Sequence, residues 1–230
     1  MQVLSSFVKT VQLRCRIGKS NCLITLLIID CLGDLGIDDQ TIGVYNQRKE
    51  EYLSWVDRNP SDSLLDFIKL IKSDGLVLDL GCGPGLASAC MKENGLRPDA
   101  VDASSEMVAL ANKTYQLGAR LLKFSDLSGE EVYDGIWANF SLLHVTKHDF
   151  KLHLRTIYEV LKPTGFFSIG MKLGQGEERD RLGRFYAYYT ESELIDLLRL
   201  NQFSLCKTYY GEERGLAGVV EPWIVLRLQK

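Results

Sequence analysis

The fold is decided by the stretch Val77-Leu78-Asp79-Leu80-Gly81-Cys82-Gly83-Pro84-Gly85, in which an apolar strand pattern runs into a glycine-rich turn. A helical pattern follows over residues 86–93. Strand, glycine turn and helix in this order are typical of the place where a doubly wound α/β fold binds a nucleotide. Glycine suits such a turn because a backbone without Cβ atoms can bend tightly and approach a ligand closely.

After this turn, short apolar runs alternate with amphipathic stretches of helical period, which predicts a parallel sheet covered by helices. The predicted strands are residues 77–80, 100–102, 120–124, 135–138 and 166–171, and the predicted helices are residues 86–93, 105–115 and 148–161. Further predicted elements are a helix from a capping box at Thr190 and Glu193 to Leu200, strands at 203–209 and 223–228, and upstream helices at 45–56 and 64–71. The predicted fold class is α/β, with a seven-stranded, mostly parallel sheet, helices on both faces and an antiparallel C-terminal edge hairpin.

Three classes of ligand compete for the glycine turn. A triphosphate loop needs GxxxxGK[ST], and the required lysine and hydroxyl do not follow Gly85. A dinucleotide loop needs G-x-G-x-x-G, but counted from Gly81 the third glycine falls one position early, with Leu86 where glycine or alanine is needed. Asp79 would be favoured beside a ligand that bears an ammonium and a sulfonium. Asp102 follows a second strand, where a carboxylate can accept both ribose hydroxyls.

Five segments in chain order make the pattern specific. They are DLGCGPG, VDASSEM, SDL, YDGIWANFSLLH and LKPTG, which begin at Asp79, Val101, Ser125, Tyr133 and Leu161. Their order and spacing resemble the class I S-adenosylmethionine-dependent methyltransferases of small-molecule type, from about Tyr45 to the C-terminus. The resemblance implies S-adenosylmethionine as cofactor, S-adenosylhomocysteine as product, and no metal.

The same resemblance implies a set of cofactor-binding residues. Gly81, Gly83 and Gly85 would line the methionine portion of the cofactor, and Asp79 would help to hold its amino group. Asp102, with Ala103 beside it, would take the ribose. The remaining implied contacts are Asp126 and Leu127 beside the adenine, Asn139 and Phe140 near the methionine, and Tyr45 over the cofactor.

The methyl acceptor is predicted to lie under residues 174–189, which combine glycine, charge and four aromatic residues after the last parallel strand. Ligands bind beyond the carboxyl ends of the strands in an open α/β sheet, so this segment is predicted to be a substrate lid. A solvated charge run on a mobile loop is the alternative. Arg184 is predicted to meet an anionic acceptor, because its guanidinium matches a carboxylate or phosphate, and Arg181 is the second choice. Tyr186 belongs to the same predicted substrate site.

Two further regions contribute candidate residues. Tyr45, Arg48 and Tyr52 lie where related enzymes have a helix over the cofactor, and the spacing of the two tyrosines suggests a shared face that shields the sulfonium, although core packing gives the same spacing. His144 follows the fourth strand and is the candidate general base, because the pKa of histidine ordinarily lies near neutrality; fixing a loop is the alternative role. His148 and His153 are predicted to be surface residues.

The composition is that of a folded, soluble protein, with 46% hydrophobic and 25% charged residues among 230. A net charge of -3 gives no overall field to hold a polyanion, so nucleic acid is disfavoured as a partner. The six cysteines and three histidines show no common spacing, which predicts neither a zinc site nor a disulfide framework. A reducing, cytoplasmic location is expected.

Residues 1–40 are predicted to be an N-terminal extension of a domain formed by residues 41–230. The first 29 residues carry four basic residues and no acid, and the apolar run at 22–29 is too short to cross a bilayer. A secretory signal is disfavoured because the charges and the cleavage site are misplaced, whereas an organellar targeting peptide stays an alternative. The simplest interpretation is a partly helical extension without chemistry of its own.

The predicted function is methyl transfer from S-adenosylmethionine to oxygen or nitrogen of a small metabolite, with Arg184 favouring an anionic one. A methyltransferase that acts on RNA or protein, supported by the basic N-terminal segment, is one alternative. A non-catalytic module that binds S-adenosylmethionine is the other. No membrane partner is expected, and the chain is predicted to be a monomer or a homodimer.

Overall fold

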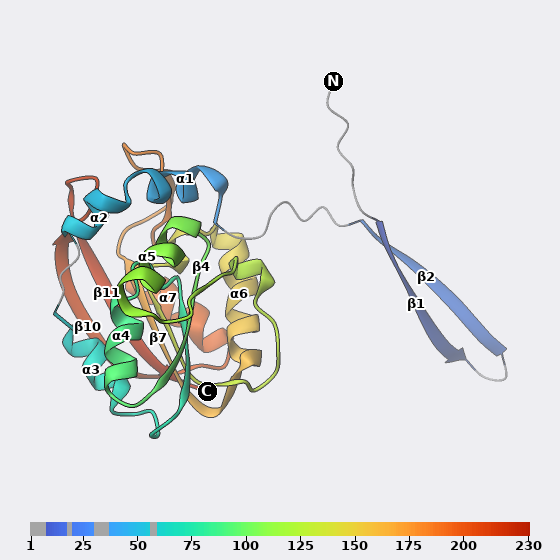
Figure 1. The fold of residues 1–230 in the computed structure, drawn as a ribbon. Coiled ribbons are helices and arrows are strands. Elements are labelled where there is room, and N and C mark those ends of the chain that lie inside the picture. The colour runs from blue at the N-terminus through green and yellow to red at the C-terminus, as the bar shows by residue number, and fades with distance from the viewer. Residues whose placement is uncertain (1–7, 18–19, 30–36, 56–58) are drawn as a thin grey trace. The chain divides into compact units, whose positions relative to one another are not determined.

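A computed structural model of the chain describes residues 8–17, 20–29, 37–55 and 59–230 (Figure 1). It divides into two compact units, Met1–Leu35 and Gly36–Lys230. The first unit contains an antiparallel hairpin of β1 (Val8–Ile17) and β2 (Ser20–Ile29). The expectation of partial helix is therefore wrong: apolar residues alternate with polar ones along β1, and this period of two favours a strand.

The second unit is built on a seven-stranded sheet in the order β10-β11-β7-β6-β3-β4-β5. Five neighbouring strands run parallel: β5 (Arg120–Leu121), β4 (Arg97–Asp102), β3 (Leu76–Leu80), β6 (Tyr133–Asn139) and β7 (Leu161–Lys172). Two antiparallel strands, β11 (Val220–Gln229) and β10 (Ser204–Arg214), complete the edge beside β7. The predicted fold class is confirmed.

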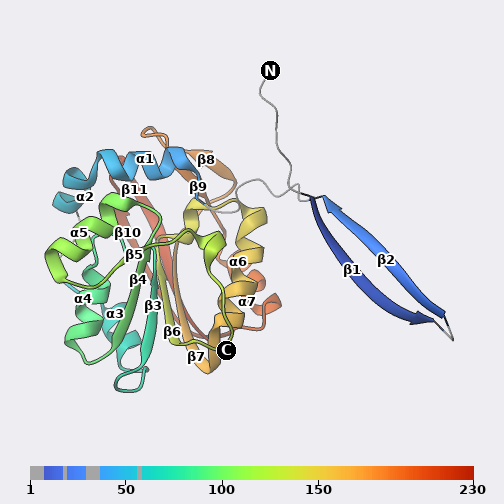
Figure 2. The same cartoon turned by 45° about the vertical axis from the view of Figure 1, so that its right-hand side comes forward.

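Helices cover both faces of this sheet. Figures 1 and 2 place α3 (Asp62–Ile68), α4 (Leu86–Glu93) and α5 (Ser105–Tyr115) on one face, and α6 (Lys147–Val160) and α7 (Glu191–Leu200) on the other. The largest cluster of buried residues packs α6 and α7 on the sheet, through side chains such as Phe150, Leu154 and Leu194. A second cluster joins α3 and α4 to the opposite face through Phe67 and Met91.

Hydrogen-bonding side chains set the starts of α5, α6 and α7, and the cap at Thr190 is the one that the sequence predicts. Ser104, Thr146 and Thr190 each occupy the N-cap and accept a hydrogen bond from the backbone N–H three residues later, at distances of 3.1, 3.1 and 3.2 Å. Apolar residues at helical spacing then face the sheet. The observed bounds of α5, α6 and α7 lie within one residue of the predicted ones for these reasons, and those of α4, which begins after Gly85 without a side-chain cap, agree as well.

The predicted helix at 45–56 is wrong in its bounds, because the structure has two helices in this region. The first, α1 (Asp39–Gln47), begins six residues earlier, where Asp38 caps it by accepting from the backbone N–H of Thr41 at 3.1 Å. The helical run is interrupted at Arg48 and resumes as α2 (Lys49–Trp55). The predicted strand at 120–124 is also shorter, since β5 ends at Leu121 and a 3-10 turn, η1 (Phe124–Asp126), follows.

The parallel strands end at a common edge, and this edge carries the loops that matter for function. The glycine turn follows β3, Asp102 ends β4, Asn139 ends β6 and Lys172 ends β7. Helix α1 lies across this edge, because its Tyr45 contacts His144 in η2 (Leu142–His144), the turn after β6. The topology therefore gathers the candidate residues from distant parts of the sequence.

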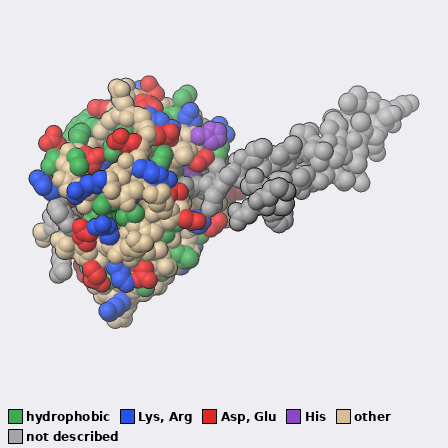
Figure 3. Space-filling view, turned by 90° about the horizontal axis from the view of Figure 1, so that it is seen from above, with side chains coloured by type: hydrophobic (Ala, Val, Ile, Leu, Met, Phe, Trp, Pro, Cys, Tyr) green, Lys and Arg blue, Asp and Glu red, His purple; other side chains and the backbone are tan. Residues whose placement is uncertain are grey.

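Three properties of the described residues bear on possible partners and ligands. On the face shown in Figure 3, acidic and basic side chains of the second unit are interspersed. Within the described parts of the chain, no helix is long and apolar enough to cross a membrane. In the same residues, no cluster of three or more histidine, cysteine, aspartate or glutamate side chains could hold a metal ion.

Candidate functional site

The three glycines of the turn after β3 have different surroundings. Gly81 and Gly85 have φ values of +82° and +89°, and a Cβ atom would lie 2.3 Å from Ser141 Cβ at the first and 2.6 Å from Leu117 Cδ1 at the second. At Gly83, with φ of +54°, the nearest atom to a Cβ would be a Tyr52 carbon at 4.0 Å. Packing thus explains Gly81 and Gly85, whereas Gly83 leaves open space that a ligand can approach.

Two carboxylates flank this turn without a cationic partner among the described residues. Asp102 accepts from the backbone N–H of Gly83 and of Ser104, both at 2.8 Å. Asp79 is 2% exposed and accepts from the Ser88 hydroxyl at 2.6 Å. Burial raises the pKa of both carboxyls, and that of Asp79 reaches about 7. Such a pair favours a ligand that brings positive charge.

The end of β6 forms the next part of the site. The amide oxygen of Asn139 is buried and has no hydrogen-bond partner among the described residues. Gly170 makes room for this amide, because a Cβ there would lie 2.1 Å from the oxygen. Phe140 follows with a φ of +57°, a conformation that costs energy in a residue other than glycine and often occurs at functional sites. An unpaired buried acceptor here is well suited to bind a donor group of a ligand.

These observations fit the cofactor that the sequence implies. Open backbone at Gly83, unpaired carboxylates and a free amide oxygen together match a nucleoside that carries cationic groups. Ala103 follows Asp102 directly and is half-buried. Asp126, the last residue of η1, is exposed, and Leu127, which follows it, is buried. The role of each of these residues in cofactor binding stays a prediction.

A cavity of about 510 Å³ lies beside the carboxyl ends of β6 and β7. Its aromatic walls come from α1, α2, β6, β9 (Phe185–Ala187) and β11, and include Tyr45, Tyr52, Phe140, Tyr186 and Trp223. Of the predicted substrate residues, Tyr52, Arg184 and Tyr186 line this cavity. Arg48 does not line it; its side chain is 44% exposed and pairs with Glu51 at 2.7 Å. Arg181 is also exposed and outside the lining.

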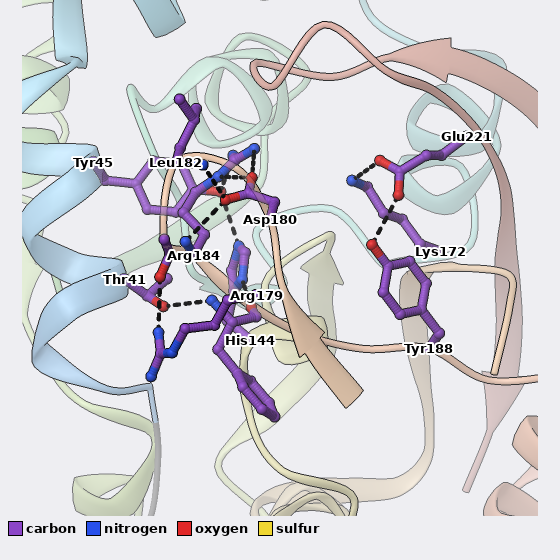
Figure 4. A network of polar contacts seen from close by, with 12 residues as sticks. Thr41, Tyr45, His144, Lys172, Arg179, Asp180, Leu182, Arg184, Tyr188 and Glu221 are labelled. Atoms are coloured by element: carbon purple, nitrogen blue, oxygen red, sulfur yellow. Dashed lines mark hydrogen bonds and ion pairs between the residues drawn. The ribbon is translucent and has the colours of Figure 1, made fainter. Parts of the chain in front are cut away.

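Arg184 is buried and already paired, as Figure 4 shows. Its side chain is 3% exposed and donates to Asp180 Oδ2 from Nε at 2.9 Å and from Nη2 at 2.7 Å. A third donor, Nη1, reaches the Tyr45 hydroxyl at 3.1 Å. The other oxygen of Asp180 accepts from two backbone N–H groups of the same hairpin. The guanidinium is therefore held rigidly and its charge is compensated.

His144 continues this network, with both ring nitrogens in use. Nδ1 lies 2.7 Å from the Phe185 carbonyl oxygen, which can only accept, so Nδ1 carries the proton. Nε2 therefore accepts from the Tyr45 hydroxyl at 2.8 Å. Burial lowers the pKa of His144 to about 3, and the charges of Arg184 and Lys172 act in the same direction. The ring is neutral at physiological pH; its role as a general base stays a prediction.

The segment 174–189 forms the short hairpin of β8 (Glu177–Arg179) and β9. Its charged strand is exposed, whereas Tyr186, Tyr188 and Tyr189 belong to the main core. The backbone N–H of Phe185 donates to the Thr41 hydroxyl at 2.9 Å, which fastens the hairpin to α1. The aromatic residues are thus packed into the protein.

Two expectations about helical side chains have different outcomes. Tyr45 and Tyr52 share a face, with ring centroids 5.6 Å apart, although the break at Arg48 lies between them. His148 is exposed as predicted. His153 is 6% exposed, so its prediction as a surface residue is wrong; it lies on the buried side of α6, edge-on to Phe124.

Several site residues were missed by sequence reasoning. Lys172, Glu221 and Trp223 line the cavity, and Asp180 holds Arg184. Lys172 and Glu221 form an ion pair across neighbouring strands, which can be found only when the register of β7 and β11 is known. The spacing Asp180-x-x-x-Arg184 is visible in the sequence and could have suggested a local ion pair.

Comparisons with known proteins agree with this geometry. Residues 77–165 match the model of a methyltransferase domain family. An uncharacterized methyltransferase of Staphylococcus carnosus is 27% identical over 148 residues, which cover 64% of this chain and 69% of the relative.

Two solved structures have the same fold. A Methanosarcina mazei S-adenosylmethionine-dependent methyltransferase is similar with a TM-score of 0.64 at 19% identity, over 75% of this chain and 98% of the other. The second is the Burkholderia thailandensis 1,6-didemethyltoxoflavin-N1-methyltransferase, solved with 1,6-didemethyltoxoflavin and S-adenosylhomocysteine. It has a TM-score of 0.63 at 21% identity, over 100% and 98% of the two chains.

The matched domain spans the glycine turn and the ends of β4 and β6, where the cofactor-type features lie. Residues 77–165 therefore form a methyltransferase domain, the second unit has the fold of S-adenosylmethionine-dependent methyltransferases, and S-adenosylmethionine is the cofactor that these comparisons support.

Proposed function

We propose that this methyltransferase acts on oxygen or nitrogen of a small molecule that binds in the 510 Å³ cavity. The main support for this proposal is the position of the cavity. It reaches Asn139 and Phe140 at the end of β6, where the methionine end of the cofactor is expected. Its volume is typical of small-molecule sites, and its aromatic walls enclose the ligand. We place the whole site in the unit Gly36–Lys230.

The cofactor would be held by residues from three strand ends. Asp102 would accept from the ribose hydroxyls, the open backbone at Gly83 would admit the methionine portion, and the Asn139 amide oxygen would accept from its amino group. Asp79 would compensate positive charge through its position beside the turn. Asp126 and Leu127 would border the adenine. When bound, the cofactor supplies an electrophilic methyl group on a sulfonium.

The protein would mainly align the acceptor and exclude water. In the transfer, the acceptor's lone pair forms the new bond to carbon while the sulfur–carbon bond breaks and its electrons return to sulfur, leaving a neutral thioether. A neutral acceptor loses one proton overall. Tyr45 and Tyr52 would keep water from the reacting atoms, and the pair of Tyr45 with His144 would fix the tyrosine hydroxyl.

The test uses the full chain with a methyl donor labelled on the transferred carbon. We expect label to appear in a small organic product when a metabolite extract is added, and Asp102→Ala to reduce that yield by weakening cofactor binding. Label found only in RNA or protein would contradict the proposal and favour a macromolecular acceptor. Calorimetric binding of S-adenosylmethionine with no labelled product from any extract would favour a non-catalytic binding module.

A further inference from the structure

A second polar cluster lines the cavity, apart from the residues proposed to hold the cofactor. Lys172, the last residue of β7, forms an ion pair with Glu221, and its side chain is 15% exposed. The ammonium also lies 4.1 Å from the centroid of the Tyr186 ring. Figure 4 shows this cluster beside, and separate from, the network of Arg184 and His144. Its position at a strand end places it on the acceptor side of the site.

The contacts within the cluster fix the direction of the ammonium. Glu221 uses both oxygens: one accepts from Lys172 and the other accepts from the Tyr188 hydroxyl at 2.8 Å. The carboxylate cannot turn without losing one of these bonds, and the face of Tyr186 holds the cation from another side. An ammonium has three N–H donors, and Glu221 takes one of them. Lys172 can therefore offer a fixed donor to a ligand in the cavity.

The charges around the cavity are balanced. Lys172 and Arg184, the two cations of the lining that are largely shielded from solvent, each have a carboxylate partner, because Glu221 compensates Lys172 and Asp180 compensates Arg184. His144, between them, is neutral. The other charged residues of the lining are exposed: Glu93, Glu213 and Arg214. An anionic acceptor would approach cations that are already paired, and it would lose its hydration in the cavity without a new counter-ion. This arrangement favours an acceptor without a net charge.

The walls around the ammonium are flat. The Tyr186 ring lies under Lys172, and the rings of Phe140 and Trp223 meet edge to face with centroids 6.0 Å apart. On the side of α1, Tyr45 and Tyr52 form a second edge-to-face pair. Aromatic walls of this kind bind planar rings through offset stacking and edge contacts.

Resting on the proposed small-molecule methyl transfer, we propose that the acceptor is an uncharged, planar ring compound and that Lys172 selects it by donating a hydrogen bond to its carbonyl oxygen or ring nitrogen. Glu221 is a positioning residue, since it orients the ammonium. The aromatic walls take the ring faces. Arg184, paired with Asp180, contributes to the shape of the cavity and not to the capture of an anion.

The variant that tests this role changes both members of the pair. Lys172→Met combined with Glu221→Gln removes the ammonium without leaving a lone buried charge, which would destabilise the fold for a different reason. The matched control is Lys147→Met with Glu193→Gln. Lys147 also pairs with a glutamate, at 2.8 Å, and also lies over a tyrosine ring, at 4.6 Å, but neither residue lines the cavity.

The probes are 4-hydroxyquinoline, its 2-carboxylate and 1-naphthol, titrated by NMR against protein loaded with S-adenosylhomocysteine. The first is uncharged and has a hydrogen-bond acceptor in the ring system, the second adds a negative charge, and the third lacks the ring nitrogen. We expect the first to bind about tenfold or more tightly than 1-naphthol, because one hydrogen bond to a charged donor distinguishes these two. It should also bind more tightly than the carboxylate, because the anion would lose its hydration without a new counter-ion. The Lys172/Glu221 double variant should lose the preference over 1-naphthol, and the Lys147/Glu193 control should keep it.

The inference is overturned if the carboxylate binds as tightly as the uncharged ring, if the double variant keeps the preference, or if none of the probes binds. Each of these outcomes is separable from failure of the proposed function. Label transferred to some other small compound of the metabolite extract would leave small-molecule methyl transfer intact and refute only the choice of acceptor. Absence of label from all small compounds would refute the proposed function itself.

Discussion

Carboxylates line both halves of the sheet's carboxyl edge, but their partners differ. In the half formed by β3 and β4, Asp79 and Asp102 accept only from uncharged donors, namely a serine hydroxyl and backbone N–H groups. In the half formed by the ends of β7 and β11 and by the β8–β9 hairpin, Asp180 and Glu221 each pair with a cation, Arg184 at 3% and Lys172 at 15% exposed. In the first half the carboxylates have no cation beside them, so a ligand can supply the positive charge. In the second half the charges of the cations and carboxylates compensate each other. This difference indicates that charge attraction selects the cofactor, whereas hydrogen bonding and shape select the acceptor.

The largest expected effect comes from breaking the balanced half. Arg184→Met leaves Asp180 buried without its cation, and we expect the free energy of unfolding to fall by about 3–5 kcal/mol. Adding Asp180→Asn should recover much of this loss, because the remaining amide oxygen can still accept from the backbone. Chemical denaturation of the single and double variants measures both quantities.

Arg120→Met is the matched control for this experiment. Arg120 makes the same two-donor contact with Asp99, at 3.0 and 2.7 Å, but its side chain is 47% exposed. We expect a loss of less than about 1 kcal/mol there, because solvent screens exposed ion pairs. Equal losses at the two arginines would show that burial of the Arg184 pair has no special weight.

The unbalanced half is tested by Asp102→Ala. We expect the affinity for S-adenosylmethionine to weaken by about 1–3 kcal/mol, since the variant removes the acceptor of the ribose hydroxyls. Its backbone partners, Gly83 and Ser104, also lose their carboxylate, so thermal unfolding of the ligand-free protein serves as the control for structural damage. Calorimetric titration at constant pH gives the affinity, and an unchanged value would remove Asp102 from the cofactor site.

A smaller effect is expected where the two halves meet. Tyr45→Phe removes the hydroxyl that accepts from Arg184 and donates to His144, and we expect a loss of about 1 kcal/mol in stability. Turnover should fall as well, because the tyrosine side chain would no longer be fixed over the cavity. Tyr210→Phe is the control: this ring is 56% exposed, its hydroxyl donates to Glu191, and the change should alter neither quantity appreciably. Thermal unfolding and single-turnover rates distinguish the two.

The two halves also differ in how far the sequence could predict them. Residues 79–85 are contiguous, and their residue types depend on the local backbone conformation and on nearby charges. The strand before them and the helix after them can therefore be predicted from the sequence alone. The position of Asp102 at a strand end can be predicted in the same way, because this residue ends an apolar run. The fold class and four helices were predicted on this local basis. The start of α1 at Asp39 was not, since Asp38 and its cap lie before the periodic pattern.

The acceptor half depends on contacts between residues far apart in the chain. Tyr45 meets a histidine 99 positions away, and Lys172 meets Glu221 because β7 and β11 pair in one register. The sequence marked Arg184 as a candidate substrate residue, but it could not reveal that Asp180 compensates its charge. The expectation of an anionic acceptor rested on the charge of Arg184 alone, because the sequence does not show that Asp180 is its partner.

The central claim is that the half with unpaired carboxylates binds a cationic cofactor, and the pH dependence of binding tests it most directly. Burial raises the pKa of Asp79 to about 7, so the carboxyl is largely protonated below that pH in the free protein and must ionise to compensate a cation. In the free protein, the raised pKa makes a contribution to stability that is full below the unfolded-state pKa of 3.8 and is lost as the pH rises toward 7.

The measurement is calorimetric titration of S-adenosylmethionine from about pH 5.5 to about pH 8.5, with the wild-type protein and Asp79→Asn. The account predicts that wild-type affinity rises with pH and levels off above about pH 7, as Asp79 becomes ionised without the ligand. The Asp79→Asn protein should bind more weakly at high pH and show a flatter profile. Identical profiles for the two proteins, or a wild-type affinity that falls as the pH rises toward 7, would contradict the account.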